Sequence, residues 1–252
     1  MSGSDLSDTR PAAAEATEDA RTIVFSGHTW AVKDSKGKRV GPGPCYFSGS
    51  DENVSLDNRG QLVLRITQRG ERSYCAEVIC KESFGFGTYR FYLASPVSRI
   101  DPNATLGLFT WSDSPEFAHR EIDIECAKWG KADDTNNAQF VVQPYQPPGR
   151  LLRFRVPPDL EAPIVSFTWE SNHISFQCLA GPAGAARSTN TAIREWTFSK
   201  SNIPQPGDEN ARINLWLFGG RAPMNSNRTE VIIRRFEFVP LPGVSLPRPK
   251  SD

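Results

Sequence analysis

Apolar and polar residues alternate in short stretches throughout the middle of this 252-residue chain. The clearest two-residue spacings are Leu62, Leu64 and Ile66; Tyr89, Phe91 and Leu93; and Ile213, Leu215 and Leu217. Because successive side chains of a β-strand point to opposite faces, this spacing predicts strands that bury one face. Further strands are predicted at 106–111, 121–126, 139–143, 164–170, 173–178 and 230–239. Since no comparable window keeps helical spacing, the chain is predicted to be all-β.

Short turn sequences separate the predicted strands. Asp57-Asn58-Arg59-Gly60 precedes one strand, 170–172 lies between two others, and Gly219-Gly220 follows another. Many strands joined by short turns are typical of a sandwich or a barrel. We expect one domain at 21–240, because a single β-domain commonly reaches this length. The acidic segment 1–20 is predicted to be disordered, and the Pro-rich tail 241–252 is predicted to be extended.

The composition excludes several functional classes. Lys plus Arg and Asp plus Glu both number 29, so there is no overall positive charge to attract nucleic acid or an anionic membrane. No apolar stretch is long enough for a membrane span, and the N-terminus shows no signal-peptide core. A neutral partner fits this balance best.

Cysteine and histidine spacing gives no local metal motif. The five cysteines have no CxxC pair and form an odd set, so we expect buried free thiols rather than a zinc site or a disulfide framework. The three histidines form no HExxH motif, and the loop 41–44 lacks phosphate-loop spacing. We therefore expect no catalytic metal and no nucleotide site.

The pentapeptide 121–125 reads EIDIE and carries the most chemical information in the chain. On a strand, Glu121, Asp123 and Glu125 share one face while Ile122 and Ile124 enter the core. Retaining glycosidases need a nucleophilic carboxylate and a carboxylic acid about 5 to 5.5 Å apart. Residues i and i+4 of a flat strand are ~13 Å apart, so this face would have to be concave or the side chains would have to lean together. The alternative is an amphipathic strand whose solvated face is acidic.

The residues around EIDIE resemble glycoside hydrolase family 16, the laminarinase and lichenase-like retaining β-glycanases. The resemblance covers most of 25–239 and centres on HREIDIE at 119–125, which is similar to the family's ExDxE signature. Supporting similarity lies, in order, in AEV at 76–78, FGFGTYRF at 84–91, LFTW at 108–111, QF at 139–140, FTWE at 167–170 and INLW at 213–216.

This resemblance implies a concanavalin A-like jelly-roll sandwich of two antiparallel sheets, with the glycan lying across the concave one. It implies that Glu121 is the nucleophile, Glu125 the general acid and then base, and Asp123 a helper. The residues that it implies for substrate binding are Trp216 and Trp111 as stacking platforms and Asn214, Gln139 and Glu77 as hydroxyl ligands. It leaves a structural calcium open, names no other cofactor, and implies a monomer that acts outside the cell or in its envelope.

The cleft departs from the family pattern at several positions. His119 stands where lichenase-like members have Trp, and two-residue parity would place it beside Glu121 on the cleft face. Val141 replaces an Asn, while Gln143 shares the face of Gln139, and Ile79 occupies a position that often holds Arg. Trp129 would rebuild an aromatic surface near the site. The visible cations for a sulfated glycan are His119 and Lys128.

Three functions fit these residues. The leading hypothesis is a retaining endo-acting hydrolase of β-linked polysaccharide, on β-1,3 or mixed β-1,3-1,4 glucan. A transglycosylase would use the same carboxylates and transfer the glycosyl group to another sugar. A carbohydrate-binding protein of the same fold would bind the glycan without turnover, although it has no need for three neighbouring carboxylates and their mutual repulsion.

Overall fold

The computed structural model describes residues 20–181, 191–224 and 229–243. These residues form sixteen strands and two short 3-10 turns, η1 (Val97–Arg99) and η2 (Phe218–Gly220). The predicted disordered segment 1–20 lies outside the described residues except for Ala20, and the predicted tail lies outside them except for 241–243. No described helix is long and apolar enough to cross a membrane.

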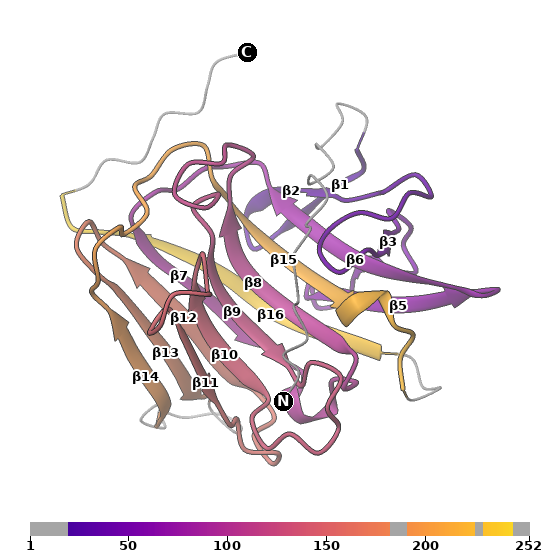
Figure 1. The fold of residues 1–252 in the computed structure, drawn as a ribbon. Helices are drawn as coiled ribbons and strands as arrows, with labels where there is room; N and C mark the ends of the chain where they lie inside the picture. The colour runs from indigo at the N-terminus through magenta and orange to yellow at the C-terminus, as the bar shows by residue number, and fades with distance from the viewer. Residues whose placement is uncertain (1–19, 182–190, 225–228, 244–252) are drawn as a thin grey trace.

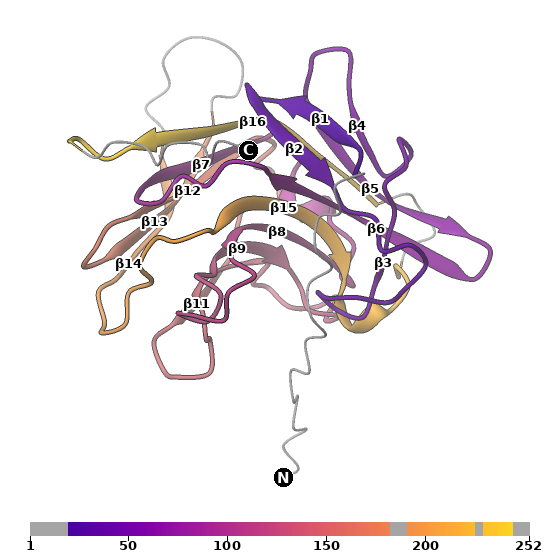
Figure 2. The same ribbon diagram turned by 90° about the horizontal axis from the view of Figure 1, so that it is seen from above.

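Two antiparallel sheets pack face to face, as the jelly-roll prediction requires (Figures 1 and 2). The first sheet has, in spatial order, β1 (Thr22–Phe25), β2 (His28–Val32), β6 (Arg72–Cys80), β15 (Asn210–Leu217), β8 (Ala104–Trp111), β9 (Ile122–Ala127), β10 (Ala138–Val142) and β11 (Leu151–Phe154). The second has β4 (Val54–Leu56), β5 (Leu62–Arg69), β16 (Thr229–Pro240), β7 (Gly87–Leu93), β12 (Pro163–Trp169), β13 (Ile174–Ala180) and β14 (Ala192–Phe198). The β5–β6 hairpin joins the sheets, and β3 (Tyr46–Phe47) pairs with β6 in the one parallel contact among the described strands.

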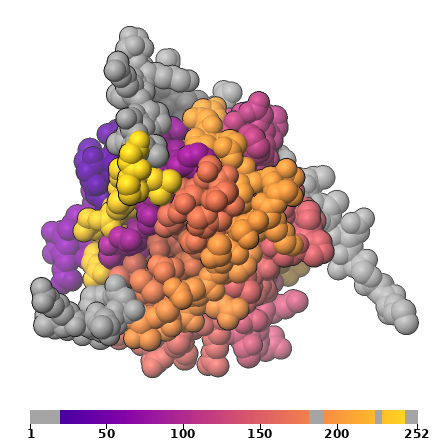
Figure 3. Space-filling model, turned by 90° about the vertical axis from the view of Figure 1, so that its left-hand side faces the viewer, coloured from indigo at the N-terminus to yellow at the C-terminus, as the bar shows by residue number. Residues whose placement is uncertain are grey.

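Each window of two-residue spacing falls in a strand, within a residue or two at the ends. Strands β1 to β4, β6, β11 and β14 were not predicted from spacing, although the family resemblance indicated a strand at 76–78 within β6. Several of these are only two to five residues long, and β14 lies at a sheet edge with four of its seven residues exposed. Figure 3 looks onto this side of the molecule, where the orange residues of β14 lie at the surface. A strand with no buried face leaves no periodic signal.

Aromatic rings fill the space between the two sheets. Tyr89 stacks on Phe167 with ring centroids 4.8 Å apart, and Phe140 of the first sheet stacks on Phe176 of the second at 5.0 Å. Each fully buried ring of this size contributes roughly 1.5 to 3 kcal/mol. All five cysteines are buried and free, which confirms the prediction from their spacing.

The second sheet covers only one face of the first. Figure 2 shows β15 and β8 arching beneath the second sheet, so that the other face of the first sheet is concave and turned outward. Residues that alternate with the core positions of β6, β8, β9 and β15 therefore meet on this concave face. We call it the cleft face.

Candidate active site

The three carboxylates of EIDIE lie on the cleft face, as their alternation predicts. Ile122 and Ile124 are fully buried between the sheets, while Glu121, Asp123 and Glu125 line one cavity on the cleft face. Glu121 directly precedes β9, and the other two lie within it. Glu121 and Asp123 are buried, with Asp123 only 3% exposed, and Glu125 is half-buried. Three acidic groups in one such cavity form the strongest concentration of negative charge in the site.

Strand register assembles a row of side chains across the cleft face. Glu125 lies opposite Gln139 on one side and Gly107 on the other, Gly107 lies opposite Asn214, and Asn214 lies opposite Glu77. Directly opposed residues of antiparallel strands point to the same face, so these polar groups share one surface. The row gathers residues from β10, β9, β8, β15 and β6.

Gly107 creates the space at the middle of this row. Its backbone N–H donates to Oδ1 of Asn214 at 3.1 Å, and a Cβ at this position would lie only 2.4 Å from that oxygen. A glycine inside a strand commonly marks such a close approach. Because glycine has no side chain, Glu125 and Asn214 face one another across the cavity.

Two glutamines on β10 and just after it hold two of the carboxylates. Nε2 of Gln139 donates to Oε2 of Glu125 at 2.7 Å, and Nε2 of Gln143 donates to Oδ2 of Asp123 at 3.1 Å. Neither glutamine is among the residues lining the cavity. In this structure each glutamine therefore orients an acidic group, and substrate binding by either one stays a prediction.

A left-handed turn delivers Glu121 to the cleft. Phe117, Ala118, His119 and Arg120 all have positive φ, between 51° and 62°. Each such residue costs roughly 1 to 2 kcal/mol, so the turn must be held from outside. Oγ1 of Thr110 donates to the carbonyl of Arg120 at 2.8 Å, and Nε of Arg120 donates to the carbonyl of Gln205 at 2.9 Å.

This turn changes the position expected for His119. The parity argument assumed that 119 continues the strand, whereas β9 begins at Ile122 and the preceding residues turn. The His119 ring instead stacks flat on Trp111, with centroids 4.2 Å apart and planes 5° apart. Its Nδ1 lies 2.9 Å from the carbonyl oxygen of Ser112, which requires the proton on that nitrogen. His119 therefore backs a cleft tryptophan and is not among the residues lining the cavity.

Trp111 and Trp216 line the cavity at different places, and each is supported by a neighbouring ring. Trp129 packs edge-on against Trp216 at 6.0 Å, so it lies behind a cavity tryptophan and does not itself line the cavity. The 41–44 loop packs on the other side, since a Cβ on Gly43 would lie 2.5 Å from the Trp216 ring. A rigid aromatic surface of this kind suits the apolar face of a sugar ring.

Two buried cations in the cleft were missed by sequence reasoning. Nζ of Lys33 lies 2.9 Å from Oε2 of Glu77 and donates to the carbonyl of Gly41 at the same distance. Nη1 of Arg212 lies 3.8 Å from Oε1 of Glu77, and its Nη2 lies 3.5 Å from Asp113. Neither His119 nor Lys128 lines the cavity, so Lys33 and Arg212 are its cations.

Arg212 also accounts for one departure from the family pattern. It lies directly opposite Ile79 in the β15–β6 register. The guanidinium absent at 79 is thus supplied from the adjacent strand, on the same face. Its alternation with Asn214 and Trp216 was a usable signal that sequence reasoning did not use.

The remaining cavity residues that were not predicted are Gly41, Pro42, Gly107 and Phe109. The first two belong to the loop 41–44, whose sequence gives no sign that it lines a cavity. Together the lining residues offer carboxylates, one amide, two cations and two indole rings. The described cavity residues contain no cluster of His, Cys, Asp and Glu donors close enough to hold a metal ion.

No protein-family model matches the chain, and no curated protein matches its sequence. Solved structures are similar in fold. A β-glucanase from Bacillus licheniformis is 18% identical with a TM-score of 0.61, covering 88% of this chain and 98% of its own. A family 16 endo-glucanase from Bacteroides ovatus is 12% identical with a TM-score of 0.61, covering 83% and 94%. A β-1,3-1,4-glucanase (lichenase) from a mouse hindgut metagenome is 19% identical with a TM-score of 0.58, covering 84% and 93%.

The fold is therefore that of the β-glucanases of glycoside hydrolase family 16, as predicted from the sequence. At these identities the similarity establishes the architecture.

Proposed function

We propose that this protein is a retaining endo-acting hydrolase of a β-linked glucan. The observation that carries the proposal is the convergence of Glu121, Asp123 and Glu125 in one cavity on the cleft face of a β-glucanase fold. A solvated acidic strand would be the alternative, but Asp123 and Glu121 are 3% and 7% exposed. Burying several carboxylates together is costly, so a binding surface alone gives no reason to keep them.

In the proposed reaction Glu121 attacks the anomeric carbon while Glu125, protonated, gives its proton to the leaving glycosidic oxygen. The aglycone leaves and a glycosyl-enzyme ester forms on Glu121. Glu125 then removes a proton from water, which attacks the same carbon and releases the sugar with its original configuration. Gln139 keeps Glu125 oriented through both steps, and Gln143 holds Asp123 beside them.

The proposed substrate is a β-1,3 or mixed β-1,3-1,4 glucan. The cleft pairs its two cations with acidic groups, Lys33 with Glu77 and Arg212 with Glu77 and Asp113, which favours a neutral sugar over a sulfated one. Trp111 and Trp216 would stack sugar rings, and Asn214 would bond a hydroxyl. The solved structures of similar fold include a β-1,3-1,4-glucanase, which supports this choice. A polymeric substrate also supports a location outside the cell or in its envelope.

A panel of polysaccharides tests the proposal: barley mixed-linkage glucan, laminarin, cellulose, agarose and carrageenan, each with wild type and Glu121→Gln. We expect wild type to shorten the first or second of these internally, and Glu121→Gln to lose more than about 10³-fold of that rate while remaining folded. Full activity in Glu121→Gln would contradict the assignment. Binding by calorimetry without any new reducing ends would favour the carbohydrate-binding alternative, and products longer than a defined oligosaccharide substrate would favour transglycosylation.

A further inference from the structure

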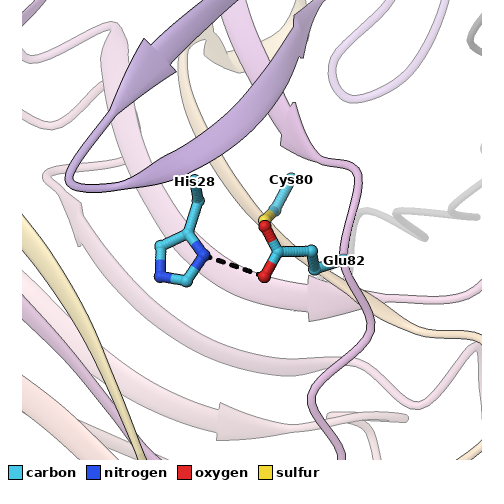
Figure 4. Close-up of side chains that lie close together, drawn as sticks. All are labelled: His28, Cys80 and Glu82. Carbon is cyan, nitrogen blue, oxygen red and sulfur yellow. Dashed lines mark hydrogen bonds and ion pairs between the residues drawn. The ribbon is translucent and has the colours of Figure 1, made fainter. Parts of the chain in front are cut away.

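Three metal-binding side chains meet at the end of the β1–β2 hairpin, away from the cleft. His28, Cys80 and Glu82 each offer a donor atom, and these atoms all lie within 4.8 Å of one another (Figure 4). Nδ1 of His28 is 3.0 Å from Oε2 of Glu82. Among the described residues this is the one group of three or more His, Cys, Asp or Glu side chains that approach so closely.

Strand register brings the three together. Trp30 of β2 lies opposite Cys80 of β6, and the ladder continues as the N–H of Lys81 donates to the carbonyl of Thr29 at 2.9 Å. Just past this ladder Nδ1 of His28 lies 3.0 Å from Oε2 of Glu82, and Cys80 shares a face with Trp30, the residue opposite it. That face is the interior one, since Cys80 is fully buried, whereas Glu77 on the same strand points to the cleft. The cluster is therefore separate from the carboxylate site.

The donor set is one imidazole, one thiol and one carboxylate. Bonds of about 2.0 to 2.3 Å in a tetrahedral site place the donors roughly 3.3 to 3.9 Å apart. The His28–Glu82 pair is already closer than this, and the other pairs, which lie within 4.8 Å, need to close by about 1.5 Å at most. Glu82 can supply this shift, because its side chain is half exposed while that of His28 is largely buried.

Packing fixes the imidazole and leaves one side open. The His28 ring packs edge-on against Phe84 at 5.1 Å and against Phe236 at 5.7 Å. These contacts come from the segment after β6 and from β16, so they orient the ring from two directions. The exposed side of Glu82 leaves a fourth position that water can fill. Calcium prefers six or more oxygen ligands, whereas imidazole with thiolate selects zinc and similar ions.

We propose that His28, Cys80 and Glu82 bind one divalent transition-metal ion of the zinc class, with water as the fourth ligand. The ion ties the start of β2 to the end of β6 and to the segment leading into β7. Its role is structural, because the cluster lies on the interior side of β6 and shares no residue with the cavity lined by Glu121, Asp123 and Glu125. The proposal does not depend on the function proposed for the cleft.

Cobalt(II) titration of the reduced, chelator-treated protein tests the site, because a cobalt–thiolate bond gives a charge-transfer band in the near ultraviolet. We expect one Co²⁺ per chain, displaced by equimolar Zn²⁺ and not by Ca²⁺. Cys80→Ala should lose the band, and His28→Ala and Glu82→Gln should weaken binding by more than about tenfold. The Glu82 side chain is half exposed, so Glu82→Gln tests the site even if the variant at the buried Cys80 folds poorly.

Two variants serve as matched controls. His173 forms a similar pair with Glu170, at 3.5 Å, that belongs to no three-donor cluster in the described chain, and Cys178 is a buried thiol on the other sheet. His173→Ala and Cys178→Ala should both bind Co²⁺ as wild type does. Absence of the band in wild type, or an unchanged band in both Cys80→Ala and Glu82→Gln, would overturn the proposal.

Discussion

The two sheets present polar residues on their outer faces in very different ways. On the second sheet, Nε2 of Gln177 donates to Oε1 of Glu195 at 2.8 Å, and this pair is exposed. On the first, Nε2 of Gln139 donates to Oε2 of Glu125 at 2.7 Å, and Gln139 is buried. The bond is chemically the same and joins adjacent strands in both places. Only the cleft face removes it from water.

The same contrast holds for ion pairs. Arg90 and Glu237 on the second sheet are 2.8 Å apart with side chains 34% and 21% exposed, whereas Lys33 and Glu77 in the cleft are 2.9 Å apart and 4% and 1% exposed. Solvent-exposed ion pairs contribute little to stability. Buried ion pairs carry a desolvation penalty that their mutual attraction must offset. The desolvation cost of a buried ion pair is therefore met on the cleft face, where the carboxylates of the proposed reaction also lie. Exposure, rather than polarity, separates the cleft from an ordinary sheet surface.

The largest expected effect is on activity, and it should separate the two glutamates that accept a hydrogen bond from a glutamine. Glu125→Gln should lower the rate of glucan cleavage by about 10² to 10⁴-fold, because it removes the proposed proton donor. Glu195→Gln should leave the rate unchanged. Initial rates of reducing-end release from mixed-linkage glucan measure both, and equal losses in the two variants would erase the distinction between the faces.

The buried and exposed ion pairs should differ in stability. Lys33→Met leaves Glu77 buried with only the more distant Arg212 as a cation, so we expect a loss of about 3 to 5 kcal/mol in the free energy of unfolding. Arg90→Met should cost no more than about 1 kcal/mol. Urea denaturation at pH 7 compares them, and a loss below 1 kcal/mol for Lys33→Met would mean that the cleft pair is effectively solvated.

The glutamines themselves should show a smaller difference. Gln139→Leu removes the donor that orients Glu125, and we expect about a tenfold fall in kcat with little change in stability. Gln177→Leu should change neither quantity. If Gln139→Leu instead raises KM alone, Gln139 binds substrate as the family resemblance implies, and the orienting role is wrong.

The smallest effects concern how stability depends on pH. Burial raises the pKa of Glu209, next to the turn that carries Arg120, and donation from the N–H of Gly207 offsets this only in part. Burial also acts to raise the pKa of Glu237, but Tyr92 and Arg90 outweigh it, and the net pKa lies below 4.5. The two carboxyls should therefore respond to pH in opposite directions.

Glu209 contributes stability below pH 4.5 that is lost as pH rises through its raised pKa, so Glu209→Gln should be more stable relative to wild type at pH 7 than at pH 4. Glu237 contributes stability above pH 4.5 that is lost as pH falls through its lowered pKa, so Glu237→Gln should cost under about 1 kcal/mol at pH 7 and less at pH 3. Urea melts of both variants across this range give the two slopes, and slopes of the same sign would contradict the assignment.

The strands and the acidic face were predictable because both depend on neighbours in the chain. Two-residue alternation places Glu121, Asp123 and Glu125 opposite Ile122 and Ile124 wherever the strand lies in the sheet. Alternation with Asn214 and Trp216 could have placed Arg212 on the cleft face. Its meeting with Lys33 at Glu77 was not predictable, because it depends on β2 and β15 flanking β6, a matter of strand order. The His28, Cys80 and Glu82 cluster was hidden for the same reason.

His119 shows a different limit. Its expected position rested on extending the strand period backward from Glu121. The turn at 117–120 breaks that period with four residues of positive φ, none of them glycine. The surrounding structure, through Thr110 and the carbonyl of Gln205, pays for a backbone that no local propensity favours.

The anomer released first from a mixed-linkage glucan tests the central claim most directly. Proton NMR during the first minutes of cleavage by wild type, before the sugar mutarotates, should show the β-anomer, since two displacements at Glu121 restore the original configuration. The same experiment with Glu121→Gln should show no product. A first product of α configuration would contradict the nucleophilic role of Glu121, and product from Glu121→Gln at the wild-type rate would contradict the whole assignment of the cleft.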